Sequence, residues 1–165
     1  MKKLYLIGGT MGVGKTAASR ELKRMLPNAV LLDGDWCWDM DPFVVNEETK
    51  AMVMDNICAC LNRFLQCSVL ENIIFCWVMH EQSIIDEILA GLDLSGCRVV
   101  VVSLICSEDA LRCRLQKDID AGIRTPDVLE CSAAWRAMYE RLNTTQIDTT
   151  AMDARAVAAE IAGRG

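Results

Sequence analysis

A single histidine, His80, occurs in this sequence, and none of its nine cysteines stands in a Cys-x-x-Cys pair. A structural zinc site is built from closely spaced cysteine and histidine ligands, so these absences argue against one. The number of cysteines is odd, and several of them lie in apolar stretches. Reduced cysteines packed in a core are typical of cytoplasmic proteins, and we expect this chain to be cytoplasmic.

Basic residues are also scarce, because 17 lysines and arginines stand against 23 aspartates and glutamates, for a net charge of -6. A protein whose main partner is a nucleic acid needs a basic face, so we expect no nucleic-acid partner. No apolar run is as long as a membrane span, and glycines and Lys15 interrupt the apolar start too early for a signal peptide. We therefore expect no membrane partner either.

What the 165 residues do contain is an alternation of apolar runs and helical patterns. Apolar runs typical of buried strands cover residues 3–7, 29–32, 72–79, 98–106 and 145–149, and helices are expected over 16–26, 46–67, 81–89, 107–121, 126–142 and 153–162. Such strands predict a parallel sheet with helices on both faces, an α/β fold of three layers. No linker or repeat interrupts the pattern, so we expect one domain over residues 1–165, with ligands bound at the carboxyl ends of the strands.

One segment matches the phosphate-binding pattern G-x-x-x-x-G-K-[ST] at all four fixed positions. An apolar strand precedes it and a helical pattern follows, as the motif requires. Its backbone N–H groups point at phosphate oxygens, Lys15 contacts the β- and γ-phosphates, and the Thr16 hydroxyl binds magnesium. The sequence therefore predicts a site for ATP and Mg²⁺ made by Gly9, Thr10, Met11, Gly12, Val13, Gly14, Lys15, Thr16 and Ala17.

Two acids, Asp33 and Asp35, follow the second predicted strand. Residues two apart in an extended chain project to the same side, so both carboxylates are expected to face one site. One can support magnesium while the other accepts a proton from an attacking hydroxyl. The alternative is a turn that uses aspartate and glycine for local reasons.

A phosphate loop near the start of a small α/β chain, followed by Asp33-Gly34-Asp35, resembles the small P-loop kinases. These include gluconate kinase, shikimate kinase, adenylylsulfate kinase and chloramphenicol phosphotransferase. The resemblance implies the P-loop nucleoside triphosphate hydrolase fold, with a five-stranded sheet of order 2-3-1-4-5. It also implies that Asp33 is the acid on the magnesium side and that Asp35 is the base.

The same resemblance implies a lid over the ATP phosphates at approximately residues 112–126. Arg114 and Arg124 are the arginines we expect there, Arg124 in a catalytic role with Lys15 and Asp35. A guanidinium suits both the charge of phosphoryl transfer and a flat ring face, although a solvated helix face is the simpler alternative. Thr149 follows the last predicted strand, where such kinases hold the edge of the adenine.

The acceptor site is expected between the second strand, the helix over 46–67 and the third strand. Only Lys50 and Arg63 are basic between Asp33 and Cys97, so a phosphorylated acceptor is disfavoured. The candidate acceptor contacts are Asp35, Trp36, Trp38, Phe43 and His80. The aromatics suit a flat or apolar-faced molecule, unless they pack under the helix. His80 can equally be structural, and Glu81 either supports magnesium or begins the next helix.

These patterns predict an ATP-dependent phosphotransferase that acts on a hydroxyl of a small, unphosphorylated acceptor, as a monomer or homodimer. A nucleoside monophosphate kinase, or a nucleotide-binding protein or ATPase without kinase activity, is the alternative. A regulatory GTPase is disfavoured because the Asn-Lys-x-Asp motif is absent, and Asp93-Leu-Ser-Gly96 follows a helix and not a strand. A mechanical ATPase would have a strand that ends in Asp-Glu, which this sequence lacks.

Overall fold

The computed structural model describes all residues from Met1 to Gly165. Its five strands form one parallel sheet in the order β2-β3-β1-β4-β5, which confirms the predicted topology. The strands are β1 (Lys2–Gly9), β2 (Ala29–Asp33), β3 (Asn72–Cys76), β4 (Cys97–Ile105) and β5 (Thr145–Asp148). The helices are α1 (Lys15–Met25), α2 (Glu47–Gln66), α3 (Gln82–Ala90), α4 (Glu108–Asp120), α5 (Val128–Tyr139) and α6 (Ala154–Ala162), with a 3₁₀ helix, η1, at Gly34–Trp38.

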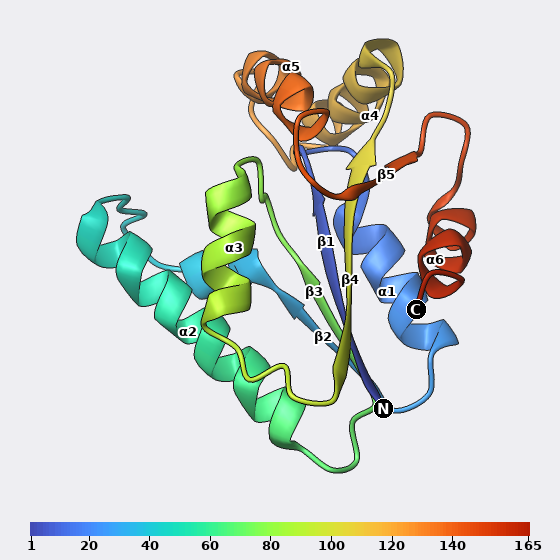
Figure 1. The fold of residues 1–165 in the computed structure, drawn as a ribbon. Helices are drawn as coiled ribbons and strands as arrows, with labels where there is room; N and C mark the ends of the chain where they lie inside the picture. The colour runs from blue at the N-terminus through green and yellow to red at the C-terminus, as the bar shows by residue number, and fades with distance from the viewer.

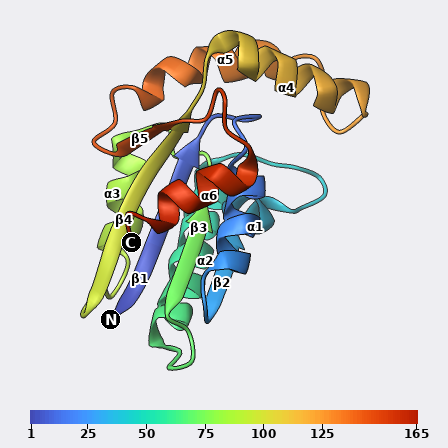
Figure 2. The ribbon, with the colours of Figure 1, turned by 90° about the vertical axis from the view of Figure 1, so that its right-hand side faces the viewer.

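The sheet separates two apolar cores, as the alternation of side chains along β1 shows. Tyr5 and Ile7 pack with α1, α4 and α6 on one face, whereas Leu4 and Leu6 pack with α2 and α3 on the other. Figure 1 shows α2 and α3 on one side of the sheet and α1 and α6 on the other. In Figure 2, α4 and α5 lie across the upper end, over the carboxyl ends of the strands. No helix is long and apolar enough to cross a membrane.

Several boundaries differ from the predictions. β3 ends at Cys76, because that residue is the last to pair with both β1 and β2. The predicted run therefore continues to Met79 without a ladder partner, apart from the Trp77 amide that donates to the Ile7 carbonyl. The helix α2 begins as expected, since Asn46 and Thr49 form a capping box that satisfies its first amides.

Candidate active site

The phosphate loop joins the central strand β1 to α1 and takes left-handed backbone angles at two of its glycines. Gly12 has φ +81° and Gly14 has φ +105°. A Cβ atom on Gly12 would lie 2.4 Å from a methyl carbon of Leu115, so this position excludes a side chain on both counts. The Lys15 Nζ donates to the Thr10 carbonyl at 2.9 Å and thus lies folded over the loop.

The charge state of Lys15 is strongly perturbed. Desolvation of its ammonium group lowers the pKa of Lys15 to about 8, and this effect exceeds the opposing influence of Cys76, Asp35 and Asp33. The adjacent Arg124 charge acts in the same direction as desolvation. A cation held in this way lacks a full counter-charge, which the phosphates of a bound nucleotide would supply.

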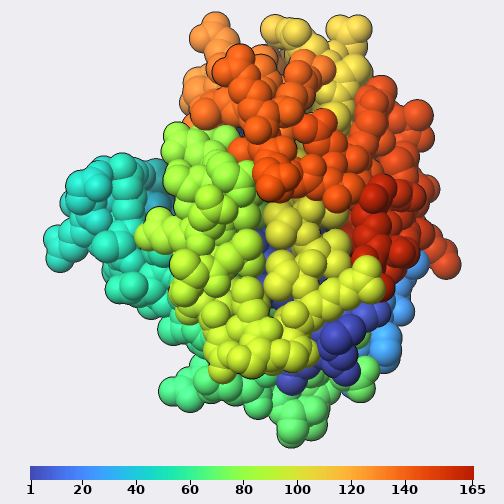
Figure 3. Space-filling model, viewed as in Figure 1, coloured from blue at the N-terminus to red at the C-terminus, as the bar shows by residue number.

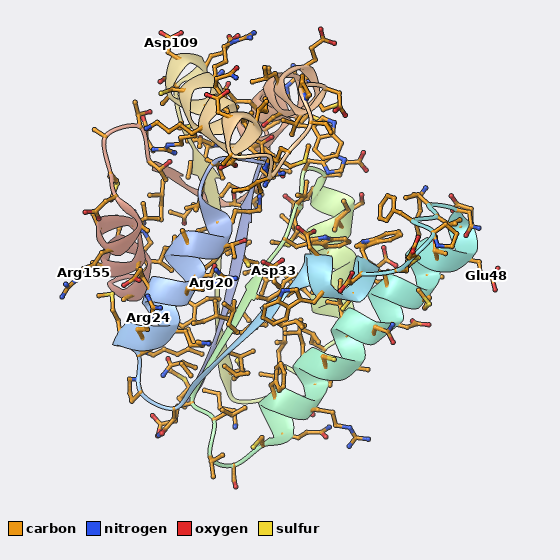
Figure 4. The ribbon with its side chains drawn as sticks, turned by 180° about the vertical axis from the view of Figure 1, so that it is seen from behind. Arg20, Arg24, Asp33, Glu48, Asp109 and Arg155 are labelled. Atoms are coloured by element: carbon orange, nitrogen blue, oxygen red, sulfur yellow. The ribbon has the colours of Figure 1, made fainter.

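Thr16 and Asp33 present oxygen atoms side by side. The Thr16 hydroxyl donates to Asp33 Oδ2 at 3.0 Å, and Asp33 is buried at the carboxyl end of β2. Figure 4 shows Asp33 near the centre of the molecule, whereas Glu48 lies at the outer start of α2. Oxygen ligands of this kind suit Mg²⁺, which takes one or two protein ligands together with phosphates and water. No group of three or more histidine, cysteine, aspartate or glutamate side chains that could hold a metal ion is present.

The geometry of Asp35 differs from the predicted extended chain. The backbone turns into η1 at Gly34, and the Asp35 amide donates to Asp33 Oδ1 at 3.1 Å, so Asp33 caps this 3₁₀ helix. Gly34 leaves room for Trp77 to pack against the turn, because a Cβ there would lie 2.4 Å from the indole. Desolvation and the charge of Asp33 raise the pKa of Asp35, while Lys15 and Arg124 oppose the shift. The pair is thus both a turn and a cluster of carboxylates beside Lys15.

Arg114 links three distant segments around the phosphate loop. Its guanidinium donates to the Val13 carbonyl at 3.0 Å, to the Thr149 hydroxyl at 3.0 Å and to the Thr149 carbonyl at 2.6 Å. Thr149 is buried and also approaches the Ile105 carbonyl. These contacts place both residues beside the loop, Arg114 from the start of the predicted lid and Thr149 from the segment after β5.

Arg124 lies in the turn between α4 and α5. Its Nε donates to Asp118 at 3.2 Å, and about a third of its side chain is exposed. Its charge acts on both Lys15 and Asp35. The turn therefore brings a cation toward the loop without fixing it to the loop.

Sequence reasoning missed a further contact, Ser132 of α5. This fully buried serine donates to the Met11 carbonyl at 2.6 Å, and its hydroxyl lies 2.8 Å from that of Thr10. The Thr10 hydroxyl in turn lies 3.0 Å from the Ser132 carbonyl. A serine inside a helical pattern carries no signal of this contact, because it depends on how α5 crosses the loop.

A cavity of about 960 Å³ lies beside Asp35, between η1, α2, α3 and α5. Of the predicted acceptor residues it brings together Asp35, Trp38, Phe43 and His80, whereas Trp36 is exposed and outside the lining. Glu81 precedes α3 and lies outside the lining too. The cavity is also lined by Met11, Val45, Glu47, Lys50, Ala51, Met54, Trp77, Val78, Ile84, Glu87 and Trp135.

Two tryptophans of this lining were not predicted. Trp77 follows β3, and its position at the carboxyl end of a strand could have indicated it. Trp135 comes from α5, far along the chain, and its ring stacks on His80 with centroids 4.4 Å apart and planes 9° apart. Figure 3 shows the start of α2, in teal, standing out from the body beside α3.

A family model, AAA_18, which is described as an AAA domain, matches residues 6–144 of the chain. The chain belongs to the AAA_18 family. Its AAA_18 domain implies nucleotide binding. No curated protein matches the chain by sequence.

Solved structures resemble this AAA_18 chain over nearly its whole length. The tunicamycin resistance protein of Deinococcus radiodurans is 19% identical, with a TM-score of 0.75 and coverage of 99% of this chain and 95% of that one. A gluconokinase of Sinorhizobium meliloti is 16% identical, with a TM-score of 0.67 and coverage of 98% and 93%. The APS kinase of Mycobacterium tuberculosis is 14% identical, with a TM-score of 0.69 and coverage of 98% and 96%. At these identities the likeness concerns the fold, and it confirms the resemblance to small P-loop kinases.

Proposed function

We propose that this chain transfers the γ-phosphoryl group of ATP to a hydroxyl of a small, unphosphorylated acceptor. The observation that carries this proposal is the position of Asp35, which lines the acceptor cavity and also acts electrostatically on Lys15 of the phosphate loop. A group at this junction can accept the proton of a hydroxyl that attacks the phosphoryl group. Its raised pKa makes it a better base than an ordinary aspartate.

The other residues take the roles that phosphoryl transfer requires. The loop from Gly9 to Ala17 would hold the phosphates, with Lys15 neutralising charge that develops on the transferred group. Thr16 and Asp33 would hold Mg²⁺, and the metal would supply neutralisation of phosphate charge. Arg124 would add a second cation from the lid, while Arg114 and Thr149 border the nucleoside. The cytoplasm, where ATP is abundant, remains our proposal for the compartment.

The alternatives draw less support from the site. A nucleoside monophosphate kinase has to bind the phosphate of its acceptor, yet Lys50 and His80 are the basic side chains among the lining residues. Lys50 already pairs with Glu47 at 2.9 Å. A nucleotide-binding protein without transferase activity would have no use for a carboxylate between the loop and a large cavity.

The replacement Asp35→Asn tests the proposal, because it keeps the shape of the side chain and removes the base. We expect phosphoryl transfer to fall by roughly 10²-fold, the lower end for a general base, because a loose transition state needs little proton removal. Affinity for an ATP analogue should change little. Slow hydrolysis of ATP by water serves as the readout until an acceptor is known.

The matched control is Asp39→Asn, at an exposed acid that follows the same 3₁₀ helix and lies outside the cavity lining. It should hydrolyse ATP like the parent. Asp33→Asn should instead weaken the dependence on magnesium. If Asp35→Asn hydrolyses ATP and phosphorylates a found acceptor as fast as the parent, the transferase role of Asp35 is wrong.

A further inference from the structure

We infer that the acceptor is a drug-sized hydroxyl compound that carries no negative charge and has a flat, apolar ring system. This inference rests on the proposed function, since it names the class of molecule that would occupy the cavity beside Asp35. Four properties of that cavity support it: its size, its aromatic walls, its exposed apolar rim and the sign of its charges.

The cavity is large and mainly apolar. It encloses about 960 Å³, and 10 of its 15 lining residues are hydrophobic. Cavities that bury drug-sized ligands range over roughly 300–1,000 Å³, so this one is at the upper end. A small sugar acid would leave most of the space to water and would place hydroxyl groups against walls that cannot bond them. The phosphate-loop residues from Gly12 to Thr16 are absent from the lining, so this volume is not the phosphate site.

Aromatic rings from separate elements of the fold form part of the wall. Three of the four tryptophans, Trp38, Trp77 and Trp135, line the cavity. Trp38 and Phe43 lie with centroids 5.8 Å apart, and Trp135 is held by its stack on His80. Fixed ring faces favour a flat ring between or against them, since offset and edge-to-face aromatic contacts add to the burial of apolar area.

The rim of the cavity carries exposed apolar side chains. Phe43 is 66% exposed and Val45 is 54% exposed, although both line the cavity. Contiguous exposed apolar side chains beside a pocket mark a surface that a ligand covers. A molecule with an apolar body would bury these side chains, whereas a polyol would leave them in water.

The charged groups of the lining disfavour anions. Asp35 and Glu87 have no ion-pair partner, whereas Lys50 is neutralised by Glu47. An anionic group on the acceptor would meet these two carboxylates, and the lining offers no free lysine or arginine to compensate. Lys15 and Arg124, whose charges act on Asp35, lie outside the lining on the side of the phosphate loop. The acceptor is therefore neutral or cationic.

Two dyes with one ring skeleton test the assignment. N-phenyl-1-naphthylamine is neutral, and 1-anilinonaphthalene-8-sulfonate is its anionic analogue. Energy transfer from the tryptophans reports binding, and Trp36→Phe removes the one tryptophan outside the lining. We expect the neutral dye to bind at least about 10-fold more tightly than the sulfonate, which is the scale of one unscreened like charge near a protein surface.

Paired variants establish where the dyes bind. Ala51→Phe fills the cavity from the exposed surface of α2 and should weaken the neutral dye at least about 10-fold, whereas Met52→Phe, one residue along and outside the lining, should not. Glu87→Lys should tighten binding of the sulfonate about 10-fold and leave the neutral dye unchanged. Asp86→Lys makes the same change of net charge outside the lining and should leave the ratio of affinities as in the parent.

The outcomes separate this inference from the proposed function. Equal affinity for the two dyes, or equal effects within either pair of variants, overturns the inference whether or not phosphoryl transfer is found. Turnover of small polyols in preference to neutral aromatic hydroxyl compounds also overturns it and leaves the transferase standing. If the dyes and the paired variants behave as expected but Asp35→Asn acts like the parent, the transferase role of Asp35 is wrong. The inference that the cavity binds a neutral or cationic aromatic compound then still stands.

Discussion

The two halves of the site are built in opposite ways. Around the phosphate loop, side chains of distant segments bond to backbone carbonyls, as Arg114 does to Val13 and Ser132 does to Met11. Around the acceptor cavity, apolar and aromatic side chains pack without such bonds, and part of the rim is exposed. A loop held in place by hydrogen bonds suits the binding of one chemical group of fixed geometry, such as a phosphate. An apolar cavity selects by shape and charge, so the two halves should respond separately to mutation.

The sharpest test of that separation is Lys15→Ala. Removing the cation from the phosphate loop should lower ATP turnover by about 10²–10³-fold, the scale of losing one group that stabilises developing charge. Binding of the neutral dye should stay as in the parent, because Lys15 does not line the cavity. Titrations with ATP and with the dye measure both. Unchanged affinity and turnover would remove the basis for a phosphate site here.

The next largest effect concerns pH. A bound phosphate prefers the protonated form of Lys15, and its pKa is lowered to about 8 in the free protein. Above that pH the lysine must take up a proton when ATP binds, so affinity should fall by up to about 10-fold per pH unit. Below it affinity should be insensitive to this group. Calorimetry with an ATP analogue measures the slope, and Lys15→Met should abolish it, while neutral-dye binding stays level.

A smaller effect is expected at the joint between α5 and the loop. Ser132→Ala would leave the partly buried Met11 carbonyl without this donor and should cost about 1–2 kcal/mol of unfolding free energy. Urea denaturation measures the change. Ser83→Ala, at an exposed serine of α3, is the control and should stay within about 0.5 kcal/mol of the parent. Equal stability of the two variants would show that the hydrogen bond from Ser132 to Met11 does not stabilise the protein.

The smallest expected effect is in the lid. The Arg114 side chain bonds to the phosphate loop, whereas the Arg124 side chain bonds to Asp118 and not to the loop. Hydrogen exchange over residues 114–125 should slow several-fold when an ATP analogue binds, because closure excludes water. The protection should be strongest after Ala121. A uniform response of the whole chain would argue against a separate lid.

Much of the fold could be predicted, because each strand was marked by a local pattern. Continuous apolar runs indicated parallel strands buried on both faces, and the glycines of the phosphate loop indicated the junction of β1 and α1. The strand order came from the resemblance to P-loop kinases and not from the runs. The predicted end of β3 was wrong, because the strand ends at Cys76, the last residue that pairs with β1 and β2.

The candidate site was less predictable, and unevenly so. Thr16 was assigned from the phosphate-loop motif and Asp33 from the resemblance to small P-loop kinases, and the structure joins them by a hydrogen bond. The turn at Gly34 was only the alternative to an extended chain, and no local pattern reports that Trp77, which follows β3, packs against Gly34. Trp135 and Ser132 lie in a helix whose crossing of the sheet no local pattern reports. Much of the lining of the cavity beside Asp35 therefore depends on tertiary packing, which the sequence patterns do not report.

The bonds made by Arg114 also have a consequence for the order in which the chain is made. Its bond to Val13 spans 101 residues, and Thr149 approaches the same carbonyl across 136. On the ribosome, the phosphate loop emerges long before either partner does. β1 likewise has to wait for β3 and β4, which flank it in the sheet. A nascent chain that lacks α4 and the segment after β5 thus carries the complete motif without its supports, and tight capture of nucleotide becomes a property of the nearly finished polypeptide.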